Sequence, residues 1–249
     1  MAASPAQLLS LRLVMKMKTL SPQDDLRLLE DRFSFFKDIS GLQQLREEDH
    51  WILGLDEVGR GCVAGPVTAS AFAYRFNEKS LVWTPPYRVY DSKKLSEKQR
   101  FEAHTFLNSE PKFIAKIGEC SPEEIDEINI LQASLKAMKK AAAECLKYIP
   151  QSSHVWVLVD GNQDPKMAEI MEDRKWDMSC VVKGDSHSFA IAAASIVAKE
   201  TRDSFMKRIA ADVHQDFSWD TNVGYPTPAH KAAVKTHGLT KWHRKSFRV

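Results

Sequence analysis

Two adjacent carboxylates, Asp56 and Glu57, end an apolar run and stand directly before three glycines in the stretch ILGLDEVGRGCVAGP, residues 52–66. Two further apolar runs end in the same way, HVWVLVD at Asp160 and MSCVVKGD at Asp185. If the ends of these runs are neighbours in a sheet, four carboxylates meet in one small space. Their mutual repulsion would force some of them to take up protons, unless cations are bound there.

Oxygen ligands of this kind suit a hard divalent cation, Mg²⁺ or Mn²⁺, rather than zinc. Two such ions about 3.5–4 Å apart can hold both the attacking and the leaving oxygen of a phosphoryl displacement. Hydrolysis of a phosphodiester is therefore the chemistry that these carboxylates predict. Simple turn capping explains any one of the four well, but all four together less well.

The glycines beside the first two carboxylates have a role in the same hypothesis. Gly59, Arg60 and Gly61 let the backbone pass close to a ligand and present its amide groups. Gly59, Gly61 and Gly65 also form a GxGxxxG pattern, which alone is a weak indicator of dinucleotide binding. A proline and two β-branched residues follow the third glycine and favour a strand, whereas the dinucleotide motif requires a helix.

Apolar spacing predicts the elements that must position these residues. The predicted strands are residues 51–56, 67–76, 112–120, 154–160 and 178–185, and the helices include 96–108, with a capping box at Ser96 and Gln99, and 189–210. Ser121 and Pro122 are expected to open a single helix of about six turns with one buried stripe from Ile125 to Cys145. A meander of strands, followed by strands that alternate with helices, predicts a mixed sheet covered by helices.

The ends of the chain differ from its centre. Residues 1–50 are leucine-rich and charged, and we expect an N-terminal appendage with two short amphipathic helices, followed by a catalytic domain at 51–249. After Asp220 there is no acidic residue, whereas six lysines and arginines follow. Such a basic tail, with aromatic residues among its cations, suits either a polyanionic partner or simple solvation.

Composition excludes several classes of protein. The chain has 249 residues, of which 43% are hydrophobic, and no run approaches the roughly 20 apolar residues of a membrane helix. We therefore expect a globular, cytoplasmic protein without a membrane segment, in monomeric form. Its four cysteines are far apart and form no CxxC pair, which predicts reduced thiols instead of a zinc site or disulfides.

Seven blocks, in order, closely resemble bacterial ribonuclease HII, the type 2 ribonuclease H: GLDEVGRGCVAGPV, YDSKKLS, LVDGN, VVKGD, AIAAASIVAKETRD, GYPTPAH and HRKSF. The resemblance implies an α/β, ribonuclease H-like fold: three antiparallel strands followed by two parallel ones in a five-stranded mixed sheet flanked by helices. It also implies an endonuclease that cleaves the RNA strand of RNA·DNA hybrids. Such an enzyme also nicks 5′ of a single ribonucleotide in duplex DNA, leaving a 3′-hydroxyl and a 5′-phosphate.

The resemblance assigns roles to individual residues. Its acidic ligands, which would hold two Mg²⁺ or Mn²⁺ ions, fall on Asp56, Glu57, Asp160 and Asp185. The backbone of its glycine-arginine-glycine element, Gly59, Arg60 and Gly61, would recognise the ribose 2′-hydroxyl, the group that distinguishes RNA from DNA. Tyr225 would lie against the following deoxyribose, and Lys93 would contact a phosphate.

Several alternatives stay open. Taken alone, Lys93 is a solvated loop charge and Tyr225 an aromatic that anchors a turn. His230 and His243 are either phosphate-facing or structural, and Ser186 and Ser188 could bind a phosphate at a helix N-terminus. For the whole chain, the alternatives are a ribonuclease HIII-like hybrid nuclease and a nucleic-acid-binding module without hydrolysis. The arginine of GRG and an aspartate as the last acidic ligand disfavour the former, and the complete set of four carboxylates disfavours the latter.

Overall fold

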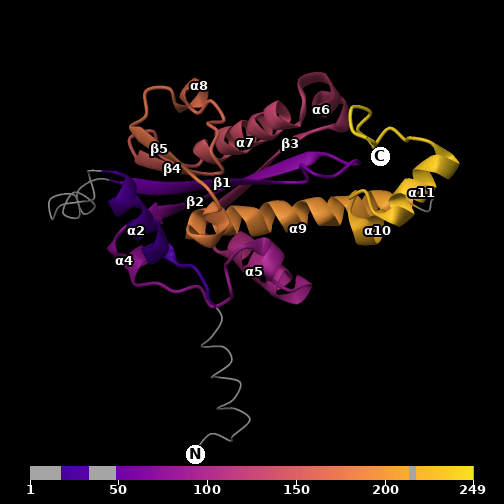
Figure 1. Ribbon diagram of the computed structural model, residues 1–249. Coiled ribbons are helices and arrows are strands. Elements are labelled where there is room, and N and C mark those ends of the chain that lie inside the picture. The colour runs from indigo at the N-terminus through magenta and orange to yellow at the C-terminus, as the bar shows by residue number, and fades with distance from the viewer. Residues whose placement is uncertain (1–17, 34–48, 213–216, 249) are drawn as a thin grey trace, which may run out of the picture.

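A computed structural model describes residues 18–33, 49–212 and 217–248. At its centre is a five-stranded sheet in the order β3-β2-β1-β4-β5 (Figure 1). β1, β2 and β3 pair antiparallel, whereas β4 and β5 run parallel to β1, which confirms the predicted fold. The strands are β1 His50–Val58, β2 Val67–Phe76, β3 Phe113–Cys120, β4 His154–Asp160 and β5 Trp176–Val181.

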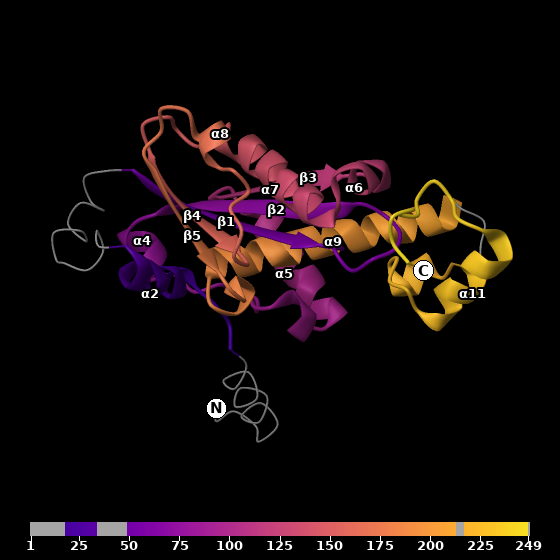
Figure 2. The ribbon, with the colours of Figure 1, turned by 45° about the horizontal axis from the view of Figure 1, so that its top comes forward.

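Helices cover both faces of the sheet, as the two views in Figures 1 and 2 show. α9 (Phe189–Asp212) lies on one face together with α5 (Glu97–Ser109) and α2 (Pro22–Arg32), and α7 (Ile130–Leu146) lies on the other. Alternate residues of β1 therefore enter different cores, with Ile52 in one and Leu53 in the other. The remaining elements are α4 Glu78–Leu81, α6 Pro122–Ile128, α8 Ala168–Met171, α10 Trp219–Asn222, α11 Pro228–His237 and the 3₁₀ turns η2 Ser92–Lys94 and η3 Gly184–Ser186.

The run of alanines in α9 allows this helix to approach β1 closely. A Cβ atom added at Gly54 would lie 2.3 Å from the carbonyl carbon of Ala190, so only glycine fits in the strand at this point. α9 then continues along the sheet towards the carboxylate end of β1. This close packing brings side chains from the middle of the helix against Asp56.

The prediction of one helix after Ser121 was wrong. Asn129, at φ 67°, separates α6 from α7, and its side chain accepts a hydrogen bond from the Gln132 amide to cap the second helix. The break turns the buried face, so that Ala133 and Ala137 are buried while Leu131, expected in the stripe, is 36% exposed. The apolar spacing across the break was consistent with one helix, but a left-handed residue resets the helical phase.

The described part of the N-terminal segment, residues 18–33, packs into the main body. Leu20 and Leu29 are fully buried in the core that also contains Ile52 and Phe72. One of the two predicted helices is thus observed as α2, and the other lies outside the described residues. The domain boundary near residue 50 stays a prediction.

Asp25 of α2 links this segment to the start of α9. The Asp25 carboxylate, fully buried, accepts hydrogen bonds from the hydroxyls of Tyr74 and Ser188 and from the amide of Ala190, at 3.1 Å. A carboxylate at a helix N-terminus is favourable because the free amides and the helix dipole both attract it. The proposed phosphate-binding role of Ser188 was therefore wrong, because the chain's own Asp25 fills that place.

Within the described ranges, no helix combines the length and apolar character needed to cross a membrane. All four cysteines, which belong to these ranges, are free thiols, and three of them are buried.

Candidate active site

Four carboxylates line one cavity of about 430 Å³ at the carboxyl ends of β1 and β4. Asp56 and Glu57 belong to β1, and Asp160 is the last residue of β4. Asp185 does not end a strand as predicted, because β5 stops at Val181 and the chain turns into η3. In the chain, η3 comes directly before α9, and the cavity gathers the four side chains from β1, β4 and η3.

Hydrogen bonds fix two of these carboxylates. The amide of Gly184 donates to Asp160 Oδ1 at 2.7 Å, which connects the end of β4 to η3. Asp56 is 6% exposed and accepts from the Glu57 amide at 2.8 Å and from the Ser195 hydroxyl of α9. The oxygen of Ser195 lies in turn 3.0 Å from that of Ser92.

The electrostatics of the cavity penalise a full set of negative charges. Burial is the largest cause that raises the pKa of each of the four carboxyls. The charge of Glu57 raises the pKa of Asp56 further, and the charge of Asp160 raises the pKa values of Asp56, Glu57 and Asp185. Burial and mutual repulsion therefore make the fully ionised set of carboxylates unfavourable, and bound cations would stabilise it.

The donors present match a hard cation. The four carboxylates supply oxygen ligands, and the residues that line the cavity include neither histidine nor cysteine. In the part of the chain that the structure describes, no three acidic, histidine or cysteine side chains are arranged closely enough to hold a metal ion. The carboxylates thus share a cavity without forming a preformed cage.

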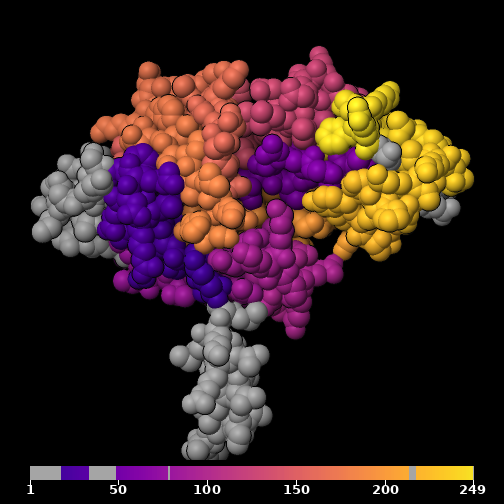
Figure 3. Space-filling model, in the orientation of Figure 1, coloured from indigo at the N-terminus to yellow at the C-terminus, as the bar shows by residue number. Residues whose placement is uncertain are grey.

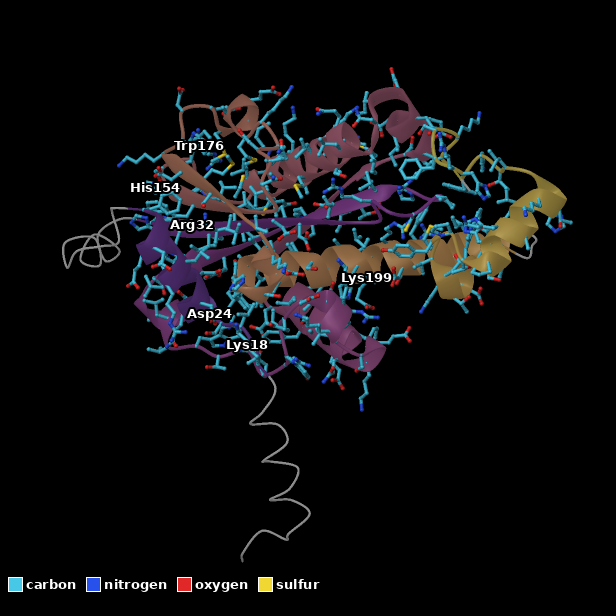
Figure 4. The ribbon with its side chains drawn as sticks, viewed as in Figure 1. Lys18, Asp24, Arg32, His154, Trp176 and Lys199 are labelled. Atoms are coloured by element: carbon cyan, nitrogen blue, oxygen red, sulfur yellow. The ribbon has the colours of Figure 1, made fainter. Side chains whose placement is uncertain are left out.

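Lys93, Arg100 and Lys199 line the cavity, and Arg100 is paired with Glu200 at 2.9 Å. Lys93 is exposed, and its charge lowers the pKa values of Glu57, Asp160 and Asp185 against the effect of burial. Arg60 donates to Glu57 Oε1 at 3.3 Å. Lys199, midway along α9 in Figure 4, is paired with Asp203 at 2.8 Å. Lys93 is thus the cation best placed to meet a substrate phosphate.

The glycine loop and Tyr225 lie together at the rim. Gly59 has φ 91°, a conformation that favours glycine, whereas Gly61 is exposed and has no such restriction. A Cβ atom at Gly61 would lie 3.7 Å from Cε1 of Tyr225, whose side chain lines the cavity. The structure therefore brings the predicted recognition residues next to the predicted ligands.

Two buried arginines, Arg202 and Arg244, were not identified as site residues from the sequence. Both donate to backbone carbonyls of the stretch 60–66 that contains the glycines. Arg244 had been counted among the cations of the basic tail, yet it is fully buried. Arg202 lies in helical phase with the buried Ala198 and Met206, and this position was the one signal that could have revealed its burial.

His230 and His243 are structural. Their Nε2 atoms lie 3.0 Å apart in a buried cluster, and the indole of Trp219 donates to His230. Burial lowers the pKa of His243 to about 4. Neutral, enclosed imidazoles of this kind hold α10 and α11 together and do not face a phosphate.

Comparison with known proteins decides the family. A family model described as Ribonuclease HII matches residues 53–249, which include the four carboxylates and all of the sheet except the first three residues of β1. The chain belongs to the ribonuclease HII family. It is accordingly a ribonuclease H, an endonuclease that acts on nucleic acid.

Relatives of this ribonuclease HII match it over most of its length. Ribonuclease HII of Salinibacter ruber is 44% identical over 200 residues, which cover 79% of this chain and 90% of the relative. Ribonuclease HII of Christiangramia forsetii is 40% identical over 198 residues, 80% of this chain and 90% of that protein. About a fifth of this chain lies outside each of these two alignments.

Solved structures share the fold. Ribonuclease HII from a complex with PCNA of Archaeoglobus fulgidus has a TM-score of 0.59 and 24% identity, over 80% of this chain and 95% of that one. Bst-RNase HIII in complex with Mn²⁺ has a TM-score of 0.61 and 15% identity, over 83% of this chain and 69% of that one. At these identities the likeness concerns the fold alone.

Proposed function

We propose that this ribonuclease HII cleaves the RNA strand of RNA·DNA hybrids and nicks duplex DNA on the 5′ side of a single embedded ribonucleotide. The products would be a 3′-hydroxyl and a 5′-phosphate. The observation that carries the proposal is that Gly61 and Tyr225 lie side by side at the rim of the cavity that contains the four carboxylates. Groups suited to recognise a ribose are thus within reach of groups suited to cut next to it.

The carboxylates support metal-assisted hydrolysis. We propose that Asp56, Glu57, Asp160 and Asp185 hold two Mg²⁺ or Mn²⁺ ions, because their oxygens are hard ligands. Burial raises the pKa of each carboxyl, and neighbouring carboxylate charge raises the pKa values of Asp56, Glu57 and Asp185 further, so bound cations would relieve an unfavourable set of charges. The chemistry that such ions supply when bound is activation of water and stabilisation of the leaving oxygen. The protein's part is to keep the carboxylates oriented, through the Ser195 hydroxyl at Asp56 and the Gly184 amide at Asp160.

Lys93 and the glycine loop supply the contacts to the substrate. The exposed ammonium of Lys93 faces the carboxylates, where it would meet a phosphate oxygen of the strand to be cut. Because Gly59 and Gly61 have no side chains, the backbone between them could approach the ribose and would hydrogen-bond the 2′-hydroxyl. The ring of Tyr225, 38% exposed, would pack against the sugar that follows.

The test is cleavage of a labelled DNA duplex with one ribonucleotide, with Mg²⁺, Mn²⁺ or a chelator, followed by mapping of the cut ends. We expect a single nick 5′ of the ribonucleotide, which chelation prevents. Asp56→Asn and Asp185→Asn should each lower the rate at least 100-fold while the melting temperature stays near that of the wild type. Full activity in both variants would refute the assigned site.

The same assay separates the alternatives. A ribonuclease HIII-like enzyme would cut a long hybrid and resist the duplex with one ribonucleotide. A binding module without hydrolysis would retain both duplexes uncut under every metal condition.

A further inference from the structure

Three cations surround the ring of Tyr90, next to the carboxylate cavity. Lys94 Nζ lies 5.2 Å from the ring centroid, and Lys18 Nζ and Arg88 Cζ each lie 5.6 Å from it. We name these four residues the Tyr90 cluster. The face of an aromatic ring attracts a cation. This attraction offsets part of the conformational entropy that a long basic side chain loses when it is held in one place. The ring thus gathers charges from the N-terminal segment, from the loop that precedes η2 and from η2 itself.

Backbone contacts fix the N-terminal part of this cluster. The amide of Leu20 donates to the Val89 carbonyl at 2.7 Å, and the amide of Val89 donates to the Thr19 hydroxyl at 2.9 Å. Arg88 Nε also donates to the carbonyl of Lys18 at 3.0 Å. Figure 3 shows the indigo N-terminal segment packed against neighbouring parts of the chain on this face. Lys18 is therefore held in place by the body of the protein.

The cluster borders the proposed metal site. Lys18 Nζ, labelled in Figure 4, donates to the carbonyl of Ser186 at 3.2 Å, one residue beyond Asp185. On the other side, Lys94 directly follows Lys93, which lines the cavity. A strand that crosses the cavity would reach the cluster with its next phosphates.

The balance of charge in the cluster is positive. Among the residues that the structure describes, Asp91 pairs with Lys94 at 3.3 Å, and no carboxylate forms an ion pair with Lys18 or Arg88. Asp185 is the other acidic group nearby, and it faces the cavity. Lys18 and Lys94 are exposed, and Arg88 is half-buried, so the charges are open to a ligand.

We propose that the Tyr90 cluster binds the phosphate backbone of the nucleic-acid duplex beside the cleavage position. Lys18 lies outside the segment 53–249 that the family model matches, so this chain extends the substrate surface with its own N-terminal segment. The proposal rests on the proposed function for the path of the strand, since Lys93 connects the cavity to the cluster. A role limited to stabilising the fold is the competing explanation, because Lys18 already donates to the Ser186 carbonyl.

Salt dependence of binding tests the proposal, because each phosphate contact by a lysine or arginine releases counterions. The probe is a fluorescent DNA duplex with one ribonucleotide, titrated by anisotropy with the full chain in a chelator at several salt concentrations. The variants are Lys18→Gln, Arg88→Gln and the double variant. Each lost contact should lower the slope of log Kd against log salt by about 0.9, and the double variant by about twice that. Affinity at low salt should fall several-fold in each single variant.

Two matched variants separate charge from structure. Arg88→Lys keeps the charge and should retain the slope of the wild type. Lys147→Gln removes an exposed lysine that is paired with Glu144 at the end of α7, and it should leave the slope unchanged. Melting temperatures identify any variant that fails through loss of fold.

The outcomes separate this proposal from the proposed function. Unchanged slopes in Lys18→Gln, Arg88→Gln and the double variant, with melting temperatures near the wild type, would overturn the cluster even if the duplex is nicked as expected. Reduced slopes in a protein that cuts neither substrate would leave the cluster as a nucleic-acid surface and refute the proposed function alone.

Discussion

The carbonyl oxygen of Pro66 accepts hydrogen bonds from both Arg202 and Arg244, at 2.9 and 3.0 Å, although the two arginines lie 42 positions apart in the chain. Arg202 also donates to the carbonyls of Ala64 and Val223, and Arg244 to those of Gly65 and Arg60. Both side chains are fully buried. Burial, with the charge of Arg202 as the next cause, lowers the pKa of Arg244 to about 10. Burying two like charges is costly. The two guanidinium groups nevertheless fix the backbone of the loop that carries the glycines, because both donate to its carbonyls.

We predict that Arg202→Lys and Arg244→Lys each lower the free energy of unfolding by about 3 kcal/mol. An ammonium cannot reproduce the planar fork, so buried carbonyls lose their donors at a cost of about 1–3 kcal/mol each. Urea denaturation followed by circular dichroism measures the change. Arg208→Lys, at an exposed position of the same helix, should stay within about 0.5 kcal/mol of the wild type. Equal stability of all three variants would contradict the role of the buried arginines.

The sheet and the strand-end positions of Asp56, Glu57 and Asp160 could be predicted because their signals are local, whereas Asp185 lies in η3, beyond the end of its strand. An apolar run that ends in an acidic residue predicts both a strand and a carboxylate at its end, as at Asp160. The role of Arg202 has no such signal, because its partner Ala64 lies 138 residues away. Helical phase with Ala198 and Met206 indicates that Arg202 is buried, but no spacing shows which carbonyls it contacts.

Asp25 illustrates the same limit for the N-terminal segment. In PQDDLRLLEDR it looks like one of several solvated acids, and an amphipathic surface helix is the natural interpretation. Its partners, Tyr74 and Ser188, are 49 and 163 positions away. The prediction of a single helix across Asn129, by contrast, failed for a local reason. The positive φ of this one residue ends α6 and changes which face of α7 is buried.

A second prediction concerns Gly61, where a methyl group is tolerated by the fold. Gly61→Ala should leave stability nearly unchanged, because its Cβ would meet only Tyr225 at an ordinary 3.7 Å. We expect nicking at a single ribonucleotide to fall at least tenfold, about 1.4 kcal/mol, since the methyl group would keep the sugar from the backbone. The measurement is kcat/KM on the labelled duplex.

Gly59→Ala is the matched variant for this prediction. Its Cβ would lie 2.3 Å from Arg202 Nε at φ 91°, and it should therefore lose roughly 1–3 kcal/mol of stability as well as activity. A Gly61→Ala enzyme with wild-type kcat/KM would show that the backbone here does not approach the ribose.

A third prediction concerns Ser195, which orients Asp56. Ser195→Ala removes the hydroxyl that donates to this carboxylate, and we expect the affinity for Mn²⁺ to fall about tenfold. Calorimetric titration of the protein without nucleic acid measures this directly. Ser134→Ala is the control, because that buried hydroxyl donates to the Ile130 carbonyl on the opposite face of the sheet. If both variants bind Mn²⁺ as the wild type does, Ser195 has no part in holding the ligand.

The last prediction follows from the buried carboxyl of Asp25. Burial raises its pKa from 3.8 to about 7, although hydrogen bonds from Ser188, Tyr74 and Ala190 act in the opposite direction. Because the pKa in the folded state is the higher one, the stability from this group is complete below about pH 4 and is lost as the pH rises to about 7. The difference in melting temperature between the wild type and Asp25→Asn should therefore shrink from pH 4 to 7 and stay constant above pH 8. Carboxyls with lowered pKa values, such as Glu124, act alike in both proteins and cancel in this difference. A difference that does not vary with pH would mean that Asp25 titrates as an ordinary carboxyl, and that its three donors offset the cost of burial.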